Sequence, residues 1–394
     1  MHWILNVLAV FLSVVVGFVI TNIPDIDPHP MVHQPLRPLP QRGDAHVTAL
    51  DNVEYLFADD NSFVGPESFV FVDDDTAVTG INDGRIVKIT GLVKGPIRYN
   101  EVTRTGEYVE GCGDIDKELV CGRPLGMKLY PLDTNKLIVA DNHGILMVDL
   151  TSGAVDVLAS PQDHNLTLPN DIEVADNGDI YWTHSGPTYR HTIHHVIMAC
   201  APSGKLFKYN RDSQKVEVLK DDLRFPNGIT MSHDGKRLLI ASCCTASVNQ
   251  FYLEGPKMGT VEPFITDLQG TPDNIRRNVR ADGKVSYFVG LGSKRSAPFA
   301  LENLVGPYPF IKRVIASLPL NTFSSLVPKF GQVLDLREDD RDPTKGTIGH
   351  YYIDYQDRKV DGKSVYWASE AEIHNGYLYI GSWCAPYLSR VKIE

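Results

Sequence analysis

Oxygen-bearing side chains recur at one position of a short phrase that appears several times along the chain. The phrase has a turn with proline or glycine, a polar residue and a brief apolar strand, and its polar members include Glu67, Asn170, Asn227 and Asp273. Two carboxylates and two amide carbonyls are ligands that calcium accepts, with water completing the shell. No Cys/His pairing accompanies them, which argues against zinc. The alternative is that they only serve turns, but their recurrence at matching places favours a calcium site.

The phrase itself predicts the architecture. Its occurrences are GPESFVF (65–71), GRPLGMKLY (122–130), LPNDIEV (168–174), FPNGITM (225–231), TPDNIRR (271–277) and a degenerate ASEAEIH (368–374). Successive prolines of the phrase are alternately about 57 and 46 residues apart, and Asn-Gly or Asp-Gly hairpin signals follow. Units of about 45–60 residues with several strands each are typical of propeller blades. We therefore expect an all-β, six-bladed β-propeller from about residue 46 to residue 394, with a large β-sandwich as the alternative.

A propeller would bring the four oxygen donors together. The innermost strand of each blade lines the central channel, so residues that open these strands converge on the axis from distant parts of the sequence. The interval before the sixth phrase contains an insertion at about residues 294–330 that has no hairpin signal. We expect it to be partly helical and to lie over one face.

The net charge of the chain excludes some function classes, and its N-terminal residues indicate a membrane or secretory route. The chain has 394 residues and a net charge of −11, which argues against nucleic-acid binding. Residues 3–20 carry no charge, so we expect residues 1–23 to be an uncleaved signal anchor, with a cleaved signal peptide as the alternative. Residues 24–45 are rich in proline and predict a stiff, extended spacer.

Two features place the rest of the chain in the lumen or outside the cell. Asn165 opens an Asn-Leu-Thr glycosylation sequon, and Cys112 and Cys121 flank an acidic loop as a short-loop disulfide would. The alternatives are a chance triplet and two buried thiols. Together the two features predict a single-pass type II membrane protein with an extracellular or luminal propeller, or otherwise a secreted one.

Several motifs taken together resemble the strictosidine synthase-like family, most closely its animal branch. They are GPESFVF with TGINDGRI (79–86), CGRPLG (121–126), LPNDIEV with DIYWT, RFPNGITMS, and GTPDNIR followed by YLYIGS. The likeness spans nearly the whole chain, including the N-terminal apolar segment, the GPKMGT loop and the segment FIKRVI.

The resemblance implies a six-bladed propeller related to calcium-dependent lactonases and paraoxonases. It implies that Glu67, Asn170, Asn227 and Asp273 bind calcium, and that the acidic loop is closed by a disulfide. It also implies a glycosylated, membrane-anchored protein of the kind to which weak arylesterase activity is attributed.

The chain departs from the family at positions that matter for chemistry. The plant enzymes that condense an amine with an aldehyde use a glutamate seven residues before the glycine of the last hairpin, where this chain has Ser369. Glu370 is one step away and is expected on the other side of the strand. His184 and Ser242 stand where the family usually has Asp and Glu. We therefore do not expect the condensation reaction.

Ester hydrolysis would need a base to activate water. His143, in VADNHGI, resembles the strand-end histidine that is held to act as base in paraoxonases, and His184 is a second candidate. Each could equally be a histidine with a structural role. We interpret the histidines of HTIHH (191–195) as exposed loop residues rather than a metal site. The sequence leaves the pairing of the four other cysteines open: Cys200, Cys243, Cys244 and Cys384.

These observations predict a calcium-dependent hydrolase that acts on a small aryl ester or lactone. The alternative is a non-catalytic propeller that binds a ligand or a protein and holds calcium only for structure. Neither the substrate nor a protein partner can be read from the sequence.

Overall fold

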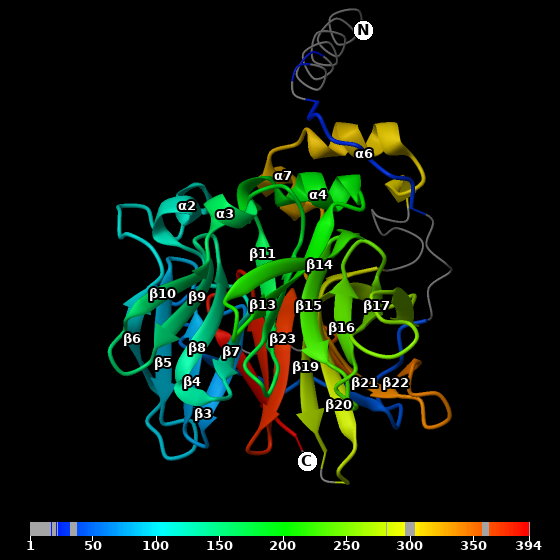
Figure 1. Cartoon of the computed structure of the whole chain (residues 1–394). Coiled ribbons are helices and arrows are strands. Elements are labelled where there is room, and N and C mark those ends of the chain that lie inside the picture. The colour runs from blue at the N-terminus through cyan, green and yellow to red at the C-terminus, as the bar shows by residue number, and fades with distance from the viewer. Residues whose placement is uncertain are drawn as a thin grey trace, which may run out of the picture.

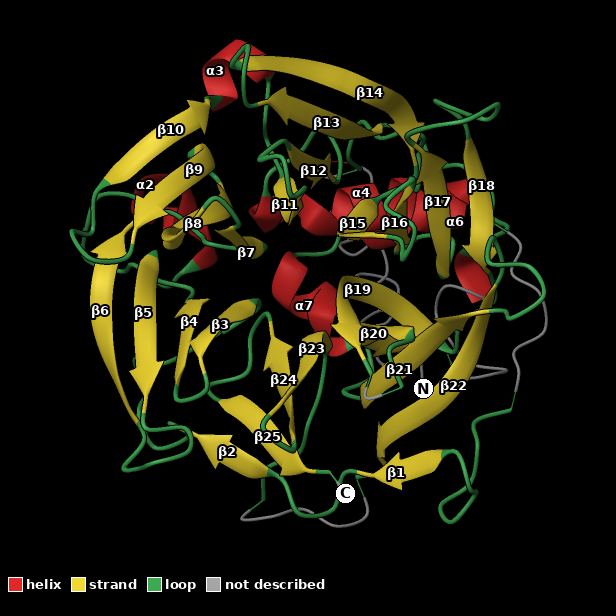
Figure 2. Ribbon diagram, turned by 60° about the horizontal axis from the view of Figure 1, so that its bottom comes forward, coloured by secondary structure: helices red, strands yellow, loops and turns green. Residues whose placement is uncertain are grey.

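The chain forms a ring of six twisted sheets around a central axis (Figure 2), which confirms the six-bladed β-propeller. The structure is a computed structural model that describes residues 17, 21, 23–31, 38–280, 282–295, 304–356 and 362–393. Within this part of the chain, no helix has the length and apolar character needed to cross a membrane. The anchor predicted over residues 1–23 lies almost wholly outside the described residues.

The blades follow one another in chain order, and each begins at the axis. Blade 1 contains β3 (Phe69–Asp73), β4 (Thr76–Gly80), β5 (Arg85–Thr90) and β6 (Arg98–Arg104). Blade 2 contains β7 (Met127–Tyr130), β8 (Asp133–Asp141), β9 (Gly144–Asp149) and β10 (Val155–Ala159). Blade 3 contains β11 (Pro169–Val174), β12 (Ile180–His184), β13 (Gly204–Asn210) and β14 (Lys215–Leu223). Blade 4 contains β15 (Pro226–Met231), β16 (Arg237–Ser242), β17 (Ser247–Tyr252) and β18 (Val261–Ile265).

The last two blades take strands from both ends of the propeller. Blade 5 contains β19 (Gly270–Val279), β20 (Val285–Lys294), β21 (Gly331–Glu338) and β22 (Gly346–Asp354), and β1 (Val47–Ala49) adds in parallel at its outer edge. Blade 6 contains β23 (Ala368–His374), β24 (Tyr377–Ser382) and β25 (Leu388–Lys392), and β2 (Glu54–Leu56) completes it. The N-terminal strands therefore close the ring and cover two sheet edges that would otherwise be open.

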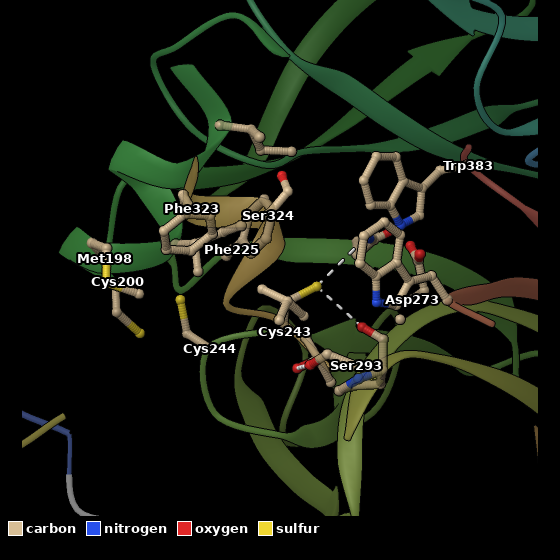
Figure 3. Close-up of a pocket in the computed structure, with 18 of the residues that line it drawn as sticks. Met198, Cys200, Phe225, Cys243, Cys244, Asp273, Ser293, Phe323, Ser324 and Trp383 are labelled. Atoms are coloured by element: carbon tan, nitrogen blue, oxygen red, sulfur yellow. Dashed lines mark hydrogen bonds between the residues drawn. The ribbon is translucent and has the colours of Figure 1, made fainter. Parts of the chain in front are cut away.

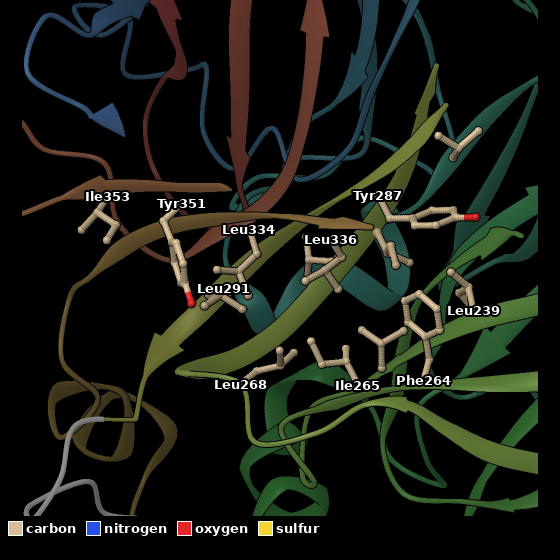
Figure 4. Packing of buried hydrophobic residues seen from close by; sticks show 14 of the residues in the cluster. Leu239, Phe264, Ile265, Leu268, Tyr287, Leu291, Leu334, Leu336, Tyr351 and Ile353 are labelled. Carbon is tan, nitrogen blue, oxygen red and sulfur yellow. The ribbon is translucent and has the colours of Figure 1, made fainter. Parts of the chain in front are cut away.

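The hydrophobic core lies between neighbouring blades rather than at one centre. Between blades 4 and 5, Leu239 and Phe264 pack against Tyr287 and Leu334, and all four are almost fully buried (Figure 4). Burying each such side chain contributes about 1.5–3 kcal/mol. The alternating apolar positions of the strands thus hold the blades side by side, and this packing fixes where the innermost strands run.

A helical roof covers one end of the channel. It consists of α4 (Ile193–Ala199), α6 (Pro309–Ala316) and α7 (Leu320–Ser325), with η2 (Arg190–Thr192) leading into α4 (Figure 1). The short η1 (Ile115–Lys117), α2 (Glu118–Cys121) and α3 (Pro161–His164) lie on the same side of the propeller. The two helices α6 and α7 come from the segment that was predicted to be partly helical.

The proline-rich segment is attached to this roof. His29 accepts a hydrogen bond from Lys312 Nζ at its carbonyl oxygen (2.7 Å), and the carbonyl oxygen of Ile26 accepts one from Arg313 Nε (3.0 Å). The backbone N–H of Met31 donates to the carbonyl oxygen of Gly306 (2.8 Å). Residues 23–31 therefore lie across α6.

Candidate functional site

A cavity of about 210 Å³ lies at the roofed end of the central channel (Figure 3). The strands supply its floor and the roof helices its cover. Its wall is mainly apolar, with side chains such as those of Leu168, Phe225, Phe323, Trp367 and Trp383. A concave, mainly apolar wall with a small number of polar groups is typical of a small-molecule site.

Four oxygen-bearing side chains meet at the floor of this cavity. Glu67, Asn170, Asn227 and Asp273 all line it, and each is at most 7% exposed. They come from blades 1, 3, 4 and 5, so residues up to 206 positions apart in sequence share one site. The structure thus brings together the four residues that the sequence predicted as calcium ligands.

A repeated β-bulge aims three of these side chains. In β11 the pairing runs from Pro169–His184 to Ile172–Trp182, so the inner strand has one residue more than its partner. β15 and β19 have the same irregularity after Pro226 and Pro272. A bulge bends the strand and redirects one side chain. The extra residue therefore follows the proline of the phrase in each blade, where Asn170, Asn227 and Asp273 stand.

The second position of each bulge faces neighbouring inner strands and is constrained differently. In blade 4 this position is Gly228, where a Cβ would lie 2.4 Å from the backbone nitrogen of Ile275 and 2.5 Å from Cα of Asn274. Only glycine avoids that clash. This close approach explains why the phrase reads Pro-Asn-Gly in blade 4.

Two amide oxygens at the floor have no hydrogen-bond partner among the described residues, which is the feature that a cation would use. Asn170 Nδ2 donates to Ser185 Oγ (2.9 Å) and Asn227 Nδ2 contacts Cys243 Sγ (3.4 Å). In this orientation each Oδ1 atom points away from the group that Nδ2 of the same amide contacts. Among the described residues, both Oδ1 atoms are buried without a hydrogen-bond partner. A buried carbonyl oxygen without a partner costs about 1–3 kcal/mol. A bound cation would satisfy both atoms.

The charges at the floor also fit a divalent cation. Burial, together with the neighbouring Glu67, raises the pKa of Asp273 well above its usual value. Burial likewise raises the pKa of Glu67, although Arg123 and Arg190 act in the other direction. Two buried carboxylates therefore oppose each other's ionisation, and calcium would relieve that conflict. Among the described residues, no three His, Cys, Asp or Glu side chains cluster as metal ligands do, so the amide oxygens are essential to this donor set.

Two arginines share the Glu67 carboxylate. Arg123 Nη2 lies 3.2 Å and Arg190 Nη1 lies 3.3 Å from Glu67 Oε2. Arg190 Nε also lies 3.2 Å from Glu118 Oε2. Arg190 enters from η2, so the roof contributes a positive charge directly beside the candidate metal ligands. Because Glu67 already has cationic partners, an incoming cation would compete with Arg190 for it.

Beneath the floor, a buried ion-pair network ties the inner strands together. Arg276 Nη1 and Nη2 contact the two carboxylate oxygens of Asp171 at 2.6 and 2.8 Å, and Arg276 also pairs with Glu370. Glu370 Oε1 accepts from the backbone N–H of Phe69 (3.0 Å). Ser369 donates its hydroxyl to the carbonyl oxygen of Glu67 (2.6 Å). Neither Ser369 nor Glu370 lines the cavity.

Neither candidate histidine lines the cavity. His184 Nε2 accepts a hydrogen bond from the backbone N–H of Thr167 (3.1 Å), and His184 is almost fully buried. His143 lies in the turn between β8 and β9, where its backbone N–H donates to Asp141 Oδ1 (2.8 Å).

The remaining predicted residues have clear positions. Cys112 and Cys121 form a disulfide with a Cα–Cα distance of 5.7 Å, which confirms the predicted bridge. Asn165 is exposed at the end of α3, where its side chain is open to modification. The interpretation of the HTIHH segment (191–195) as an exposed loop is wrong. The segment forms part of η2 and the start of α4, and His194 is buried against Phe323.

His184 predicts an acid-sensitive step in stability. Burial, with a smaller contribution from Lys205, lowers the pKa of His184 from 6.5 to about 4. The unfolded chain takes up a proton at His184 at higher pH than the folded chain does. The contribution of His184 to the free energy of unfolding is therefore complete above about pH 6.5 and falls as the pH drops toward 4. The loss amounts to about 3 kcal/mol. Unfolding measured from pH 7 to pH 4 should therefore show a shallower decline for His184→Gln than for the wild type. His164→Gln, at a histidine in α3, is the control, and equal slopes for all three proteins would contradict the prediction.

Sequence reasoning did not identify the arginines or the roof contacts. Arg123 is in the second copy of the phrase, GRPLG, and the extra basic residue there was its only signal. Arg190 lies in a segment without strand periodicity, and only the tertiary fold places it beside Glu67.

Comparisons with known proteins show which sequences and folds this chain resembles. A family model described as strictosidine synthase matches residues 170–256. The adipocyte plasma membrane-associated protein of Danio rerio is 31% identical over 354 residues, covering 88% of this chain and 79% of the relative. The protein of the same description from Homo sapiens is 32% identical over 357 residues, with 88% and 79% covered.

Solved structures with the same fold include two with informative descriptions. Regucalcin of Agrobacterium tumefaciens, described as a calcium-binding protein, has a TM-score of 0.52 at 13% identity and covers 89% of this chain and 96% of its own. A protein described as a gluconolactonase has a TM-score of 0.50 at 13% identity, with 87% and 92% covered. At these identities the likeness shows the fold.

Proposed function

Because this chain belongs to the strictosidine synthase-like family that includes the adipocyte plasma membrane-associated proteins, we propose that it is a calcium-dependent hydrolase of apolar esters or lactones. Its site is the roofed cavity at the end of the propeller channel. The N-terminal apolar segment anchors it in a membrane, with the propeller in the lumen or outside the cell.

One observation carries the proposal: the partnerless Oδ1 atoms of Asn170 and Asn227 lie at the floor of an apolar cavity together with the carboxylates of Glu67 and Asp273. Hard oxygen donors of this kind suit calcium. Calcium, when bound, supplies a Lewis acid that polarises the ester carbonyl. The descriptions of the regucalcin and gluconolactonase structures support this assignment through the shared fold.

The chain's own residues would bind and orient the substrate. Apolar side chains, among them Phe225, Trp367 and Trp383, would bind the acyl or aryl group and exclude water from it. The guanidinium of Arg190 lines the same cavity. It would stabilise negative charge that develops on the substrate as the carboxylate product forms.

The test is ester hydrolysis by the purified full chain, measured before chelation, after chelation and after calcium is restored. Phenyl esters with acyl chains of increasing length are the substrates. We expect turnover that is lost on chelation, returns with calcium and rises with chain length because the cavity wall is apolar. Glu67→Gln should lower the rate at least about 100-fold, since a ligand carboxylate is lost.

The control is Glu262→Gln, which makes the same change at an exposed ion pair with Lys257 on blade 4. Its rate should equal that of the wild type. Hydrolysis at one rate with and without chelator, and in both variants, would contradict the proposal.

A second candidate function is a binding propeller in which calcium is only structural. It is favoured by the absence of both candidate histidines from the cavity lining and by the two arginines that already pair with Glu67. Calcium that raises the unfolding temperature without any ester turnover would decide for this second function.

A further inference from the structure

Two cysteines from separate parts of the chain face each other in the cavity wall. Cys200 ends the roof helix α4, and Cys244 lies in the turn that follows β16 of blade 4. Both line the cavity. The two side chains are neighbours, and Figure 3 shows both sulfur atoms in the same space between α4 and the turn after β16.

The other thiols are directed elsewhere. Cys243 donates its thiol to the carbonyl oxygen of Pro272 (3.0 Å) and contacts Asn227 Nδ2 (3.4 Å), so it points away from Cys244 (Figure 3). Cys384 lies near Ser382 Oγ (4.0 Å) and does not line the cavity. Of the four free cysteines, only Cys200 and Cys244 are placed to react with one another.

The surroundings favour Cys200 as the reacting thiol. Its own carbonyl oxygen accepts a hydrogen bond from Arg224 Nη1, and Lys312 Nζ lies 3.5 Å from the adjacent carbonyl oxygen of Ala199. The hydrogen bond with Cys244, followed by these two cations, lowers the pKa of the Cys200 thiol despite its burial. A thiolate is the nucleophile in thiol oxidation.

The backbone at Cys200 is a second unusual feature. Cys200 caps α4 with φ at 50°, in the left-handed region where glycine is the common choice. An L side chain is strained in this region, so a cysteine is an uncommon choice here.

We propose that Cys200 and Cys244 form a redox-active dithiol that closes to a disulfide between the roof and the propeller body. With a peroxide as oxidant, the Cys200 thiolate attacks one oxygen, the O–O bond breaks, and a sulfenic acid and, after protonation, one water form. The Cys244 sulfur then attacks the sulfenic sulfur, the S–OH bond breaks, and a second water leaves with the remaining protons. Two thiols are oxidised by two electrons and one peroxide is reduced.

The structure supplies a setting in which this bond would persist. The Cys112–Cys121 disulfide shows that the fold accommodates a cystine on the same side of the propeller, and such bonds are typical of oxidising compartments. Closure would join α4 covalently to blade 4 and fix one wall of the cavity. The proposal does not depend on calcium or on hydrolysis.

The test counts thiols in the purified full chain. After mild reduction that leaves Cys112–Cys121 closed, and removal of the reductant, a chromogenic thiol reagent in denaturant should detect four free thiols, in line with the four free cysteines. After hydrogen peroxide treatment it should detect two. Peptide mapping without reduction should then recover the Cys200 and Cys244 peptides linked to each other. Cys200→Ser and Cys244→Ser should each abolish the linked peptide, whereas Cys384→Ser should still lose two thiols.

Hydrogen exchange gives an independent readout that does not need a variant. Amides of α4 should exchange more slowly in the oxidised wild type than in the reduced one, because the helix end is fixed. A count of four thiols after peroxide, a linked peptide that contains Cys243 or Cys384 instead, or unchanged α4 exchange in protein with two thiols would overturn the proposal.

Discussion

Replacing Asp273 with alanine should abolish calcium binding. The rate of ester turnover should fall at least about 100-fold as a result. Among the described residues, the carboxylates that line the cavity are those of Asp273 and Glu67. The amide oxygens of Asn170 and Asn227 are neutral, so they cannot balance the charge of the ion. One carboxylate that is already paired with two arginines would remain, and the site would lose most of its attraction for calcium.

Thermal unfolding separates this effect from simple destabilisation. Calcium at about 100 times its dissociation constant should stabilise the wild type by about 2.7 kcal/mol, because the ion binds only the folded chain. Asp273→Ala should show no stabilisation by calcium. Without calcium it should be as stable as the wild type or more so, because the alanine removes a buried carboxylate that opposes Glu67.

The matched control is Asp282→Ala in the exposed β19–β20 turn of the same blade, where the carboxylate pairs only with nearby residues of that turn. It should keep both the calcium-dependent stabilisation and the turnover. A full calcium response in Asp273→Ala would show that the ion binds elsewhere.

Arg276→Met should destabilise the propeller by about 3–5 kcal/mol, the usual result when one partner of a buried ion pair is removed. Burial opposes the charged form of Arg276, but Asp171 and Glu370 more than offset it and raise its pKa. Without the guanidinium, two buried carboxylates from blades 3 and 6 would keep only neutral hydrogen-bond donors at the axis. For a chain of this length the unfolding temperature should fall by roughly 4–7 °C.

A neighbouring residue provides the control for this change. Arg277→Met alters an exposed side chain on the same strand and should leave the unfolding temperature almost unchanged. Adding Asp171→Asn and Glu370→Gln to Arg276→Met should recover part of the stability, because neutral amides can be buried at lower cost. Equal unfolding temperatures for Arg276→Met and Arg277→Met would show that the network does not hold the blades together.

The fold was predictable because the blades repeat a local signal. The phrase with its proline, polar residue and apolar strand marks each inner strand, and the Asn-Gly and Asp-Gly turns mark the hairpins. The closure of the ring was not predictable in the same way. Strands β1 and β2 are only three residues long, and their partners β22 and β25 lie about 300 residues further along the chain.

The candidate site was predictable as far as it follows the repeat. Asn170, Asn227 and Asp273 occupy equivalent places of equivalent strands, and Glu67 has the same place in the phrase, two residues before β3 begins. The repeat therefore brings the four together. Arg190 breaks that symmetry, because it comes from the roof. Its position depends on the packing of η2 and α4 over the channel, for which no short sequence pattern exists. The contact between Cys200 and Cys244 was missed for the same reason.

The most direct measurement is a calcium titration of the metal-free full chain by calorimetry, with Asp273→Ala titrated in parallel. A site formed by Glu67, Asn170, Asn227 and Asp273 predicts one calcium per wild-type chain and none for the variant. Absence of binding by the wild type, or the same stoichiometry and affinity in both proteins, would contradict the assignment of these four residues as calcium ligands.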